Sequence, residues 1–337
     1  MNKSASLRTS VDASPDRAIA SVVQVLRERD RFIVTGHRNP EGDALGSSVA
    51  LGLALSEMGK EVIFYNADPV PRVLGLFPGA DLVTSSLAAA RKGDTVIVCD
   101  CGELERVGGE MLSRKDEFRF VNLDHHVSST GFAEISYIDP AASATSLLVF
   151  RILKALGTPI SADVATNLLC GLVTDTGSFR YSNADPETFE VAGELVRRGA
   201  RPDFISQRLF DSNEEKTFRL LARVLETLDF SGGGHVASVV VTGEMFQATK
   251  TGPEHVEGFV NYPRGVEGVE LAFLLRELGS GEWKVSLRGQ GRVDTTRIAT
   301  AYGGGGHRNA SGCTVHGTMD KVRREINERA EALLTSV

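Results

Sequence analysis

Three short apolar segments in the first half of the chain run directly into histidine or aspartate. Segments 32–36, 95–99 and 118–123 are followed by His37, Asp100 and Asp124. Helical apolar spacing lies between the segments, and this alternation predicts an α/β domain with a mainly parallel sheet and flanking helices. Ligands of such sheets gather outside the carboxyl ends of the strands, so we expect the three polar sites to lie close together.

The chain length predicts two domains, because 337 residues exceed the usual size of one domain. After a flexible break at the SGGG sequence of 231–234, shorter strands, a helix at 293–303 and a terminal amphipathic helix predict a smaller α+β domain. We expect the active site in the cleft between the two domains. The expected parts are a flexible arm at 1–14, the catalytic domain at 15–210, a helical linker at 211–233 and a substrate-binding domain at 234–337.

Charge and hydropathy limit the possible partners. The net charge of −7 argues against a long nucleic-acid duplex, which normally requires a strongly basic face, so any nucleic-acid substrate should be short. No apolar run approaches the ~20 residues that cross a bilayer, and the polar first residues lack the apolar stretch of a secretory signal. We therefore expect a cytoplasmic protein without a membrane partner.

The turn after the first apolar segment concentrates side chains that bind metals. In GHRNPEGDALGS, His37, Glu41 and Asp43 lie within seven residues of one another. Hard divalent cations prefer several oxygen ligands and tolerate imidazole, so this combination suits a metal. A simpler interpretation makes Asp43 a helix cap and His37 a solvated loop residue. The turn alone leaves both interpretations open.

Further polar groups follow other apolar segments. Asp100 ends an apolar strand, where a carboxylate is costly unless it is paired or bound to a metal. Asp124, His125 and His126 end the next strand, and because adjacent side chains point to opposite faces, the two histidines should differ in role. Asp175 ends an apolar helix, where the helix dipole favours a cation.

A glycine run in the second half suits an anion. Four glycines precede His307 in TAYGGGGHRNASG, and glycines let backbone N–H groups approach a phosphate closely. Such a run alone is more often only a loop, but basic residues accompany this one. The candidate substrate-binding residues here are Arg288, Gly304, Gly305, Gly306, His307, Arg308 and Asn309.

These motifs, taken in order, resemble those of a known family. The sequences GHRNPEGDALGS, VCDCG, NLDHH, LVTDTGSFRYSN and GGGGHRNASG are similar to the successive motifs of the DHH phosphoesterases with their DHH-associated C-terminal domain. The resemblance covers nearly the whole chain, and its last motif belongs to a different domain from the first four. The FRYSN motif and the compact second domain are most similar to the bifunctional oligoribonuclease and phosphoadenosine phosphatase branch, also called nanoRNases.

The resemblance implies a hydrolase with two manganese ions, for which Mg²⁺ or Co²⁺ could substitute. His37 and Glu41 would hold one ion, Asp43, His125 and Asp175 the other, and Asp100 would bridge them. The implied catalytic residues are Asp100, His126 facing the scissile phosphate and Asp124 supporting the histidine pair. The family usually has aspartate where this chain has Glu41, which puts the geometry and metal preference of that site in doubt.

The implied substrates are short oligonucleotides of RNA or DNA, 3′-phosphoadenosine 5′-phosphate (pAp) and dinucleotides. Arg180 and Tyr181 could bind or stack a base. The alternatives within the enzyme class are a phosphodiesterase for cyclic dinucleotides such as c-di-AMP, a single-strand DNA exonuclease and an inorganic pyrophosphatase. A nucleotide-binding regulator without turnover is an alternative from another class, and a homodimer is plausible from the resemblance alone.

Overall fold

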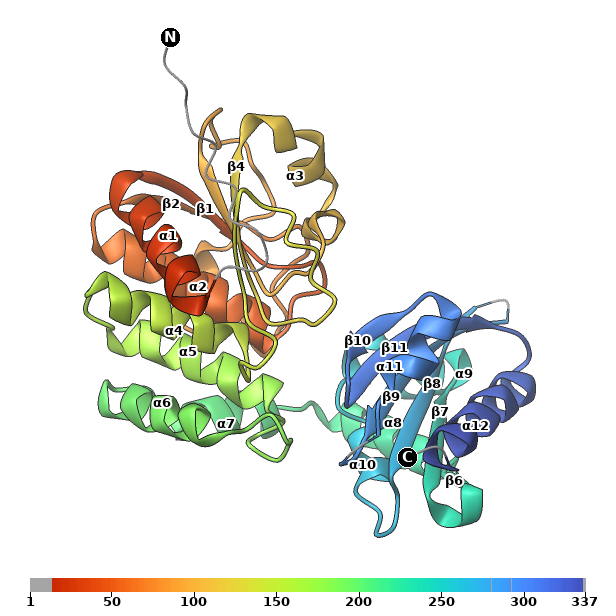
Figure 1. Ribbon diagram of the computed structural model, residues 1–337. Helices are drawn as coiled ribbons and strands as arrows, with labels where there is room; N and C mark the ends of the chain where they lie inside the picture. The colour runs from red at the N-terminus through yellow and green to blue at the C-terminus, as the bar shows by residue number, and fades with distance from the viewer. Residues whose placement is uncertain (1–13, 280, 292, 336–337) are drawn as a thin grey trace. The chain divides into compact units, whose positions relative to one another are not determined.

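The computed structural model describes residues 14–279, 281–291 and 293–335. The chain divides between Ser212 and Asn213 into two compact units (Figure 1). The fold class agrees with the sequence prediction. The first unit is an α/β domain with a parallel sheet, and the second is a smaller α+β domain with a mixed sheet. No helix within the described residues is long and apolar enough to cross a membrane.

The first unit has a five-stranded parallel sheet of order β2-β1-β3-β4-β5. Because the chain continues from β1 to one side and returns to β3 on the other, the strand order reverses between β1 and β3. Ligands of doubly wound sheets bind at such a reversal, beyond the carboxyl ends of the strands. The strands are Arg31–Thr35 (β1), Glu61–Phe64 (β2), Thr95–Cys99 (β3), Arg119–Asp124 (β4) and Ile135–Ile138 (β5).

Helices cover both faces of this sheet. Most helices share one apolar core on one face, whereas α3 packs on a smaller core on the other. Helix α2 is buried over thirteen of its sixteen residues, because it lies between the sheet and α5 (Figure 1). The helices are Pro15–Glu28 (α1), Gly42–Glu57 (α2), Gly109–Ser113 (α3), Thr145–Leu156 (α4), Ala162–Asp175 (α5), Pro186–Arg197 (α6) and Pro202–Phe210 (α7).

The second unit has a six-stranded sheet of order β10-β11-β9-β8-β7-β6, in which only β7 and β8 are parallel. The strands are Asp229–Ser231 (β6), Val236–Val241 (β7), Leu271–Gly279 (β8), Glu282–Gly289 (β9), Gly305–His307 (β10) and Ala310–His316 (β11). Its helices are Glu215–Leu225 (α8), Gly243–Thr249 (α9), Asn261–Arg264 (α10), Thr296–Ala299 (α11) and Met319–Thr335 (α12).

Local structure in the second unit differs from the sequence expectation in three places. The segment 211–233, expected as a helical linker, contains the helix α8, but the apolar face of this helix packs in a core with β7 and β8 of the second unit. The SGGG sequence connects the paired strands β6 and β7 within the unit. Only one turn of α-helix, Thr296–Ala299, forms in the segment 293–303 expected to be a helix.

Candidate metal centre

The reversal point of the first sheet brings together side chains from three strand ends. His37 follows β1, Asp100 follows β3, and His125 and His126 follow β4. Asp100 has a φ of 57°, in the left-handed region that residues other than glycine rarely adopt. Backbone strain of this kind concentrates at functional sites. Here the strained conformation directs the Asp100 carboxylate toward the site beyond the end of β3.

Close packing of α2 on α5 supplies two more carboxylates. A Cβ atom at Gly46 would lie 2.5 Å from the carbonyl oxygen of Asn167, and one at Gly171 would lie 2.5 Å from Asp43 Oδ1. Glycine at these positions therefore lets the two helices approach, with Asp43 in the first turn of α2 and Asp175 at the last residue of α5.

Three groups of potential metal ligands result, and the ligand atoms of each group lie within 4.8 Å of one another. Asp100 belongs to two of the groups, so its carboxylate is placed where it could be shared between two ions. The groups are His37, Glu41 and Asp100; Asp43, His125 and Asp175; and Asp100, His125 and His126. The first two groups are the two ligand sets that the family resemblance implied, while the assignment of ions to them stays a prediction.

His125 lies at the centre of the carboxylates. Its Nε2 atom is 3.2 Å from Asp175 Oδ2, 3.6 Å from Asp100 Oδ1 and 4.0 Å from Asp43 Oδ2. Its Nδ1 atom lies 3.0 Å from the carbonyl oxygen of Ala142, which holds the ring when Nδ1 carries the proton. In that tautomer the Nε2 lone pair faces three carboxylates, an arrangement that a bound cation stabilises.

The start of α4 holds the carboxylates in place. The backbone N–H groups of Thr145 and Ser146 donate to Asp43 at 2.6 and 2.9 Å, so a carboxylate from α2 caps α4. The Thr145 hydroxyl also donates to Asp100 Oδ1 at 3.1 Å. Asn183 donates to the carbonyl oxygens of Asp175 and Ser143 at 3.2 and 3.0 Å.

Asp124 holds His125 and His126 in place by hydrogen bonds. Its Oδ1 atom lies 2.7 Å from His126 Nδ1 and accepts the backbone N–H of His125 at 2.9 Å. The Asp124 side chain is completely buried. These contacts hold Nδ1 of His126 toward Asp124.

Burial and mutual repulsion govern the ionisation of the carboxylates. Burial, with Asp100 next, raises the pKa of Glu41 well above its usual value and that of Asp43 to about 7. Burial opposes ionisation of Asp100, but the neighbouring His37, His126 and His125 lower its pKa.

Either protons or cations must balance the negative charge of the site. Burial disfavours protonation of His125, but Asp175, Asp100 and Asp43 raise its pKa to about 10. Five carboxylates therefore share a site with three imidazoles, and their oxygen and nitrogen donors fit hard divalent cations such as Mn²⁺ or Mg²⁺. The five carboxylates are Glu41, Asp43, Asp100, Asp124 and Asp175.

Glu41 is also the N-cap of α2, a role that the sequence analysis did not predict. Its two carboxylate oxygens accept the backbone N–H groups of Asp43 at 2.8 Å and Ala44 at 2.7 Å, so it caps α2. A ligand that is also a helix cap has its carboxylate direction fixed by the helix.

Arg180 and Tyr181 lie in the turn directly after α5. Arg180 is exposed, and its Nε donates to the carbonyl oxygen of Gly177 at 2.7 Å. The Tyr181 ring lies over Gly177, where a Cβ atom would be 2.4 Å from the ring. Ser178 and Phe179 both have a φ of 61°, so this turn is held in an uncommon conformation close to Asp175.

The glycine run and Arg288 come together in the second unit. Gly305–His307 forms β10 at the sheet edge, and Arg288 of β9 lies opposite Ala310 of β11. The backbone carbonyl groups of Arg308 and Asn309 accept the N–H groups of Thr295 and Gly289. The His307 side chain lies outside the described part of the structure. A Cβ atom at Gly304 would lie 2.2 Å from the carbonyl oxygen of Gly312, and one at Gly306 would lie 2.5 Å from that of Ala310.

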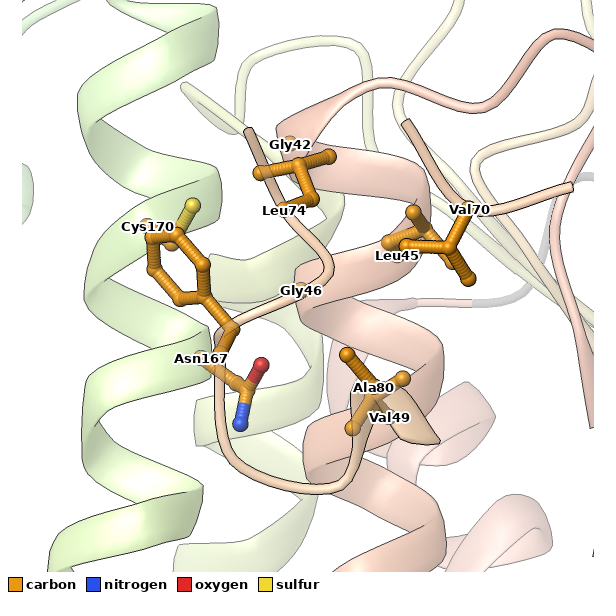
Figure 2. Close-up of a pocket in the computed structure, with 10 residues that line it drawn as sticks. Gly42, Leu45, Gly46, Val49, Val70, Leu74, Ala80, Asn167 and Cys170 are labelled. Carbon is orange, nitrogen blue, oxygen red and sulfur yellow. The ribbon is translucent and has the colours of Figure 1, made fainter. Parts of the chain in front are cut away.

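A small apolar cavity lies along the first half of α2 (Figure 2). It is lined by side chains of α2 and α5 and by the segment 70–80, including Leu45, Val49 and Cys170. Its volume is about 10 Å³, about the space of a single water molecule. The cavity is therefore a packing defect and offers no room for a nucleotide.

Both units match known domain families. Residues 31–172 match the N-terminal domain of the DHH family, and residues 237–336 match the DHHA1 domain.

Similar proteins span the whole chain. The bifunctional oligoribonuclease and PAP phosphatase NrnA of Thermus thermophilus is 34% identical over 95% of this chain and 94% of its own length. The Bacillus subtilis protein of the same name is 25% identical over 88% of this chain and 92% of its own length. An exopolyphosphatase-related protein of Bacteroides fragilis has the same structure, with a TM-score of 0.87, 29% identity and coverage of 97% of this chain and 99% of that chain. The chain therefore belongs to the DHH phosphoesterases with a DHHA1 domain, in the branch of the bifunctional oligoribonucleases and PAP phosphatases.

Proposed function

We propose that this protein is a manganese-dependent phosphoesterase that shortens very short oligoribonucleotides to mononucleotides and removes a phosphate from pAp. The observation that carries the proposal is the buried group of carboxylates and imidazoles at the strand reversal, with Asp100 shared between two ligand groups. The similarity to the Thermus protein supports the choice of substrates.

The proposed roles follow from the contacts of each residue. His37, Glu41 and Asp100 would hold one ion, and Asp43, His125, Asp175 and Asp100 a second. Bound there, two such ions would activate a water molecule at neutral pH and neutralise the phosphoryl oxygens. His126, held by Asp124, donates to the scissile phosphate.

In the second unit, Arg288 and the backbone of Gly304–Gly306 would bind a distant phosphate, with His307, Arg308 and Asn309 beside it. Arg180 and Tyr181, in the strained turn after α5, would contact a base.

The decisive experiment offers four substrates separately with Mn²⁺: a 5′-labelled RNA pentamer, pAp, cyclic di-AMP and pyrophosphate. Stepwise shortening of the pentamer together with phosphate release from pAp is the expected result. Turnover of only the cyclic dinucleotide, or only of pyrophosphate, would agree with the proposed metal centre but contradict the proposed substrates. Tight nucleotide binding without any metal-dependent product would make the protein a regulator.

Shortening Glu41 to aspartate should keep or raise the Mn²⁺-dependent activity. Aspartate is a strong helix N-cap, so Glu41→Asp can still accept the N–H groups of Asp43 and Ala44 while its carboxylate remains a metal ligand. We expect kcat to stay within about tenfold of the original or to increase, since ligand type and charge are unchanged. Steady-state kinetics over a manganese titration measure this, and complete inactivation would mean that the site is built around the longer side chain.

Manganese binding should weaken as the pH falls. The pKa of Asp43 is raised to about 7, so at pH 6 a proton must leave before this carboxylate can serve as a ligand. The proton on Asp43 alone weakens the apparent affinity by about tenfold between pH 8 and pH 6, and the protons that must also leave Glu41 and His125, whose pKa values are raised, weaken it further. Calorimetry in two buffers of different ionisation enthalpy measures both Kd and the released protons. A Kd that is independent of pH would remove Asp43 from the ligand set.

A further inference from the structure

One face of the second unit's sheet is only half covered by helices. Helices α8, α9 and α10 pack against an apolar core built on β7 and β8, with no contribution from β9 or β11 within the described residues. The opposite face is covered by α11 and α12, which pack on apolar residues of β7, β8, β9 and β11. Apart from the part of β9 that contacts α10, the uncovered area is therefore the α8–α10 side of β9 and β11, which we call the open strand face.

Strand register defines what lies on the open strand face. Arg276, Lys284 and Thr314 form one row across β8, β9 and β11. Ser286 and Gly312 lie two residues further along, where no side chain larger than that of serine stands above the strands. The next row contains Arg288 and Ala310, and Gly305 of β10 lies beside Gly312. The open strand face therefore leads from the glycine run and Arg288 to Arg276 and Lys284 without a bulky side chain between them.

Arg276 and Lys284 are two cations side by side without an anion. Lys284 is exposed and Arg276 is partly buried, and neither forms an ion pair with a carboxylate among the described residues. Glu277 is used elsewhere, because it accepts the backbone N–H of Gly243 at 2.8 Å. Partial desolvation by the neighbouring strands lowers the pKa of both groups, and the charge of Arg276 lowers that of Lys284 further. An anion between the two side chains would relieve this repulsion.

The spacing suits a short single strand. Lys284 and Arg288 are four residues apart on one strand, which is about 13 Å at a rise of about 3.3 Å per residue. A stacked nucleic-acid strand advances about 3.4 Å per nucleotide, so this distance corresponds to at most about four nucleotides. A mononucleotide bound at Arg288 cannot reach the first row, whereas an oligonucleotide of a few residues can.

We propose that Arg276 and Lys284 form a second phosphate subsite for the backbone of a single-stranded oligonucleotide held at its other end by Arg288. This inference rests on the proposed function and refines it, because it makes oligonucleotides of about four or five residues better substrates than pAp or a dinucleotide. The subsite would recognise phosphates without reading bases, which suits an enzyme that must accept any sequence.

The test compares substrates of different length in the full-length protein. The double substitution R276S/K284S should raise KM for an RNA pentamer about tenfold and leave KM for pAp and for a dinucleotide unchanged. Because each phosphate neutralised on a single strand contributes a slope of about −0.7, loss of this one subsite should reduce the salt dependence of log(kcat/KM) for the pentamer by about 0.7. The added cation of Thr314→Lys, in the same row, should instead lower KM for the pentamer.

Lys321 and Arg324 provide a matched control, because they are exposed on α12, which packs against the opposite face of the sheet. K321S/R324S changes the net charge equally and should leave the pentamer KM unchanged. An equal loss in both double variants, or a loss that affects pAp as much as the pentamer, would overturn the second subsite. If the unmodified protein cleaves neither pAp nor the pentamer, the proposed function itself fails.

Discussion

Replacing Asp100 with alanine should abolish turnover of every substrate. The Asp100 carboxylate is shared between two potential ligand groups and lies 3.6 Å from His125 Nε2 and, through its other oxygen, 3.6 Å from His37 Nε2. Its loss removes a ligand from both proposed ion sites. Metal-ion catalysis contributes several kcal/mol, so we expect kcat to decrease by at least about 10³-fold, together with weaker Mn²⁺ binding measured by calorimetry.

Asp94, at the other end of β3, provides the matched control for the Asp100 substitution. It is buried to a similar extent and immediately precedes β3, but it pairs with Arg31, far from the ligand groups along the strand. Asp94→Ala should lower the thermal midpoint while the folded protein keeps its kcat. Substantial turnover by Asp100→Ala, or an equal loss in the folded Asp94→Ala protein, would contradict the two-ion assignment.

The sheet and the residues at its strand ends could be predicted from the sequence for a physical reason. Apolar runs that end in His37, Asp100 or Asp124 specify both the buried strand and the edge where it stops. In a parallel sheet those ends share one edge, so local patterns define a site between residues far apart in the chain.

The supporting contacts could not be predicted in the same way. Thr145 and Ser146 contact Asp43 and Asp100 only because the start of α4 meets the start of α2 in the folded chain. The spacing of residues in the sequence does not indicate that these two helix ends lie together. Gly171 lies in an apolar helical sequence, and nothing in that sequence indicates that its missing side chain makes room for Asp43.

The second unit was harder to predict because its signals are short. Strands of three residues, such as β6 and Gly305–His307 (β10), are stabilised by pairing with their neighbours and have no distinctive pattern of their own. The α-helical spacing at 293–303 was overridden by contacts of Thr295, whose backbone N–H and hydroxyl both donate to the carbonyl oxygen of Arg308. Tertiary hydrogen bonds there replaced a continued helix.

Replacing His126 with alanine should slow the reaction strongly while manganese binding remains. Burial disfavours protonation of His126, but the hydrogen bond to Asp124 and the charge of Asp100 raise its pKa, so the ring is poised to donate to a phosphate oxygen. General acid and hydrogen-bond catalysis of this kind contributes about 10²–10⁴-fold, and we expect a decrease of about 10³-fold in kcat. Single-turnover kinetics with saturating Mn²⁺ measure the chemical step directly.

The same variant separates two roles that the geometry permits for His126. Its Nδ1 atom lies 3.6 Å from Asp100 Oδ1 as well as 2.7 Å from Asp124 Oδ1, so it could also serve as a metal ligand. If Asp124 only orients the His126 ring, Asp124→Asn should lower kcat by about 10–100-fold. Asp124→Asn and His126→Ala should then each bind as many manganese ions as the original protein. His125→Ala should bind fewer, because Nε2 of His125 faces three carboxylates. A reduced manganese stoichiometry in His126→Ala would make His126 a ligand and transfer the contact with the phosphate to another residue.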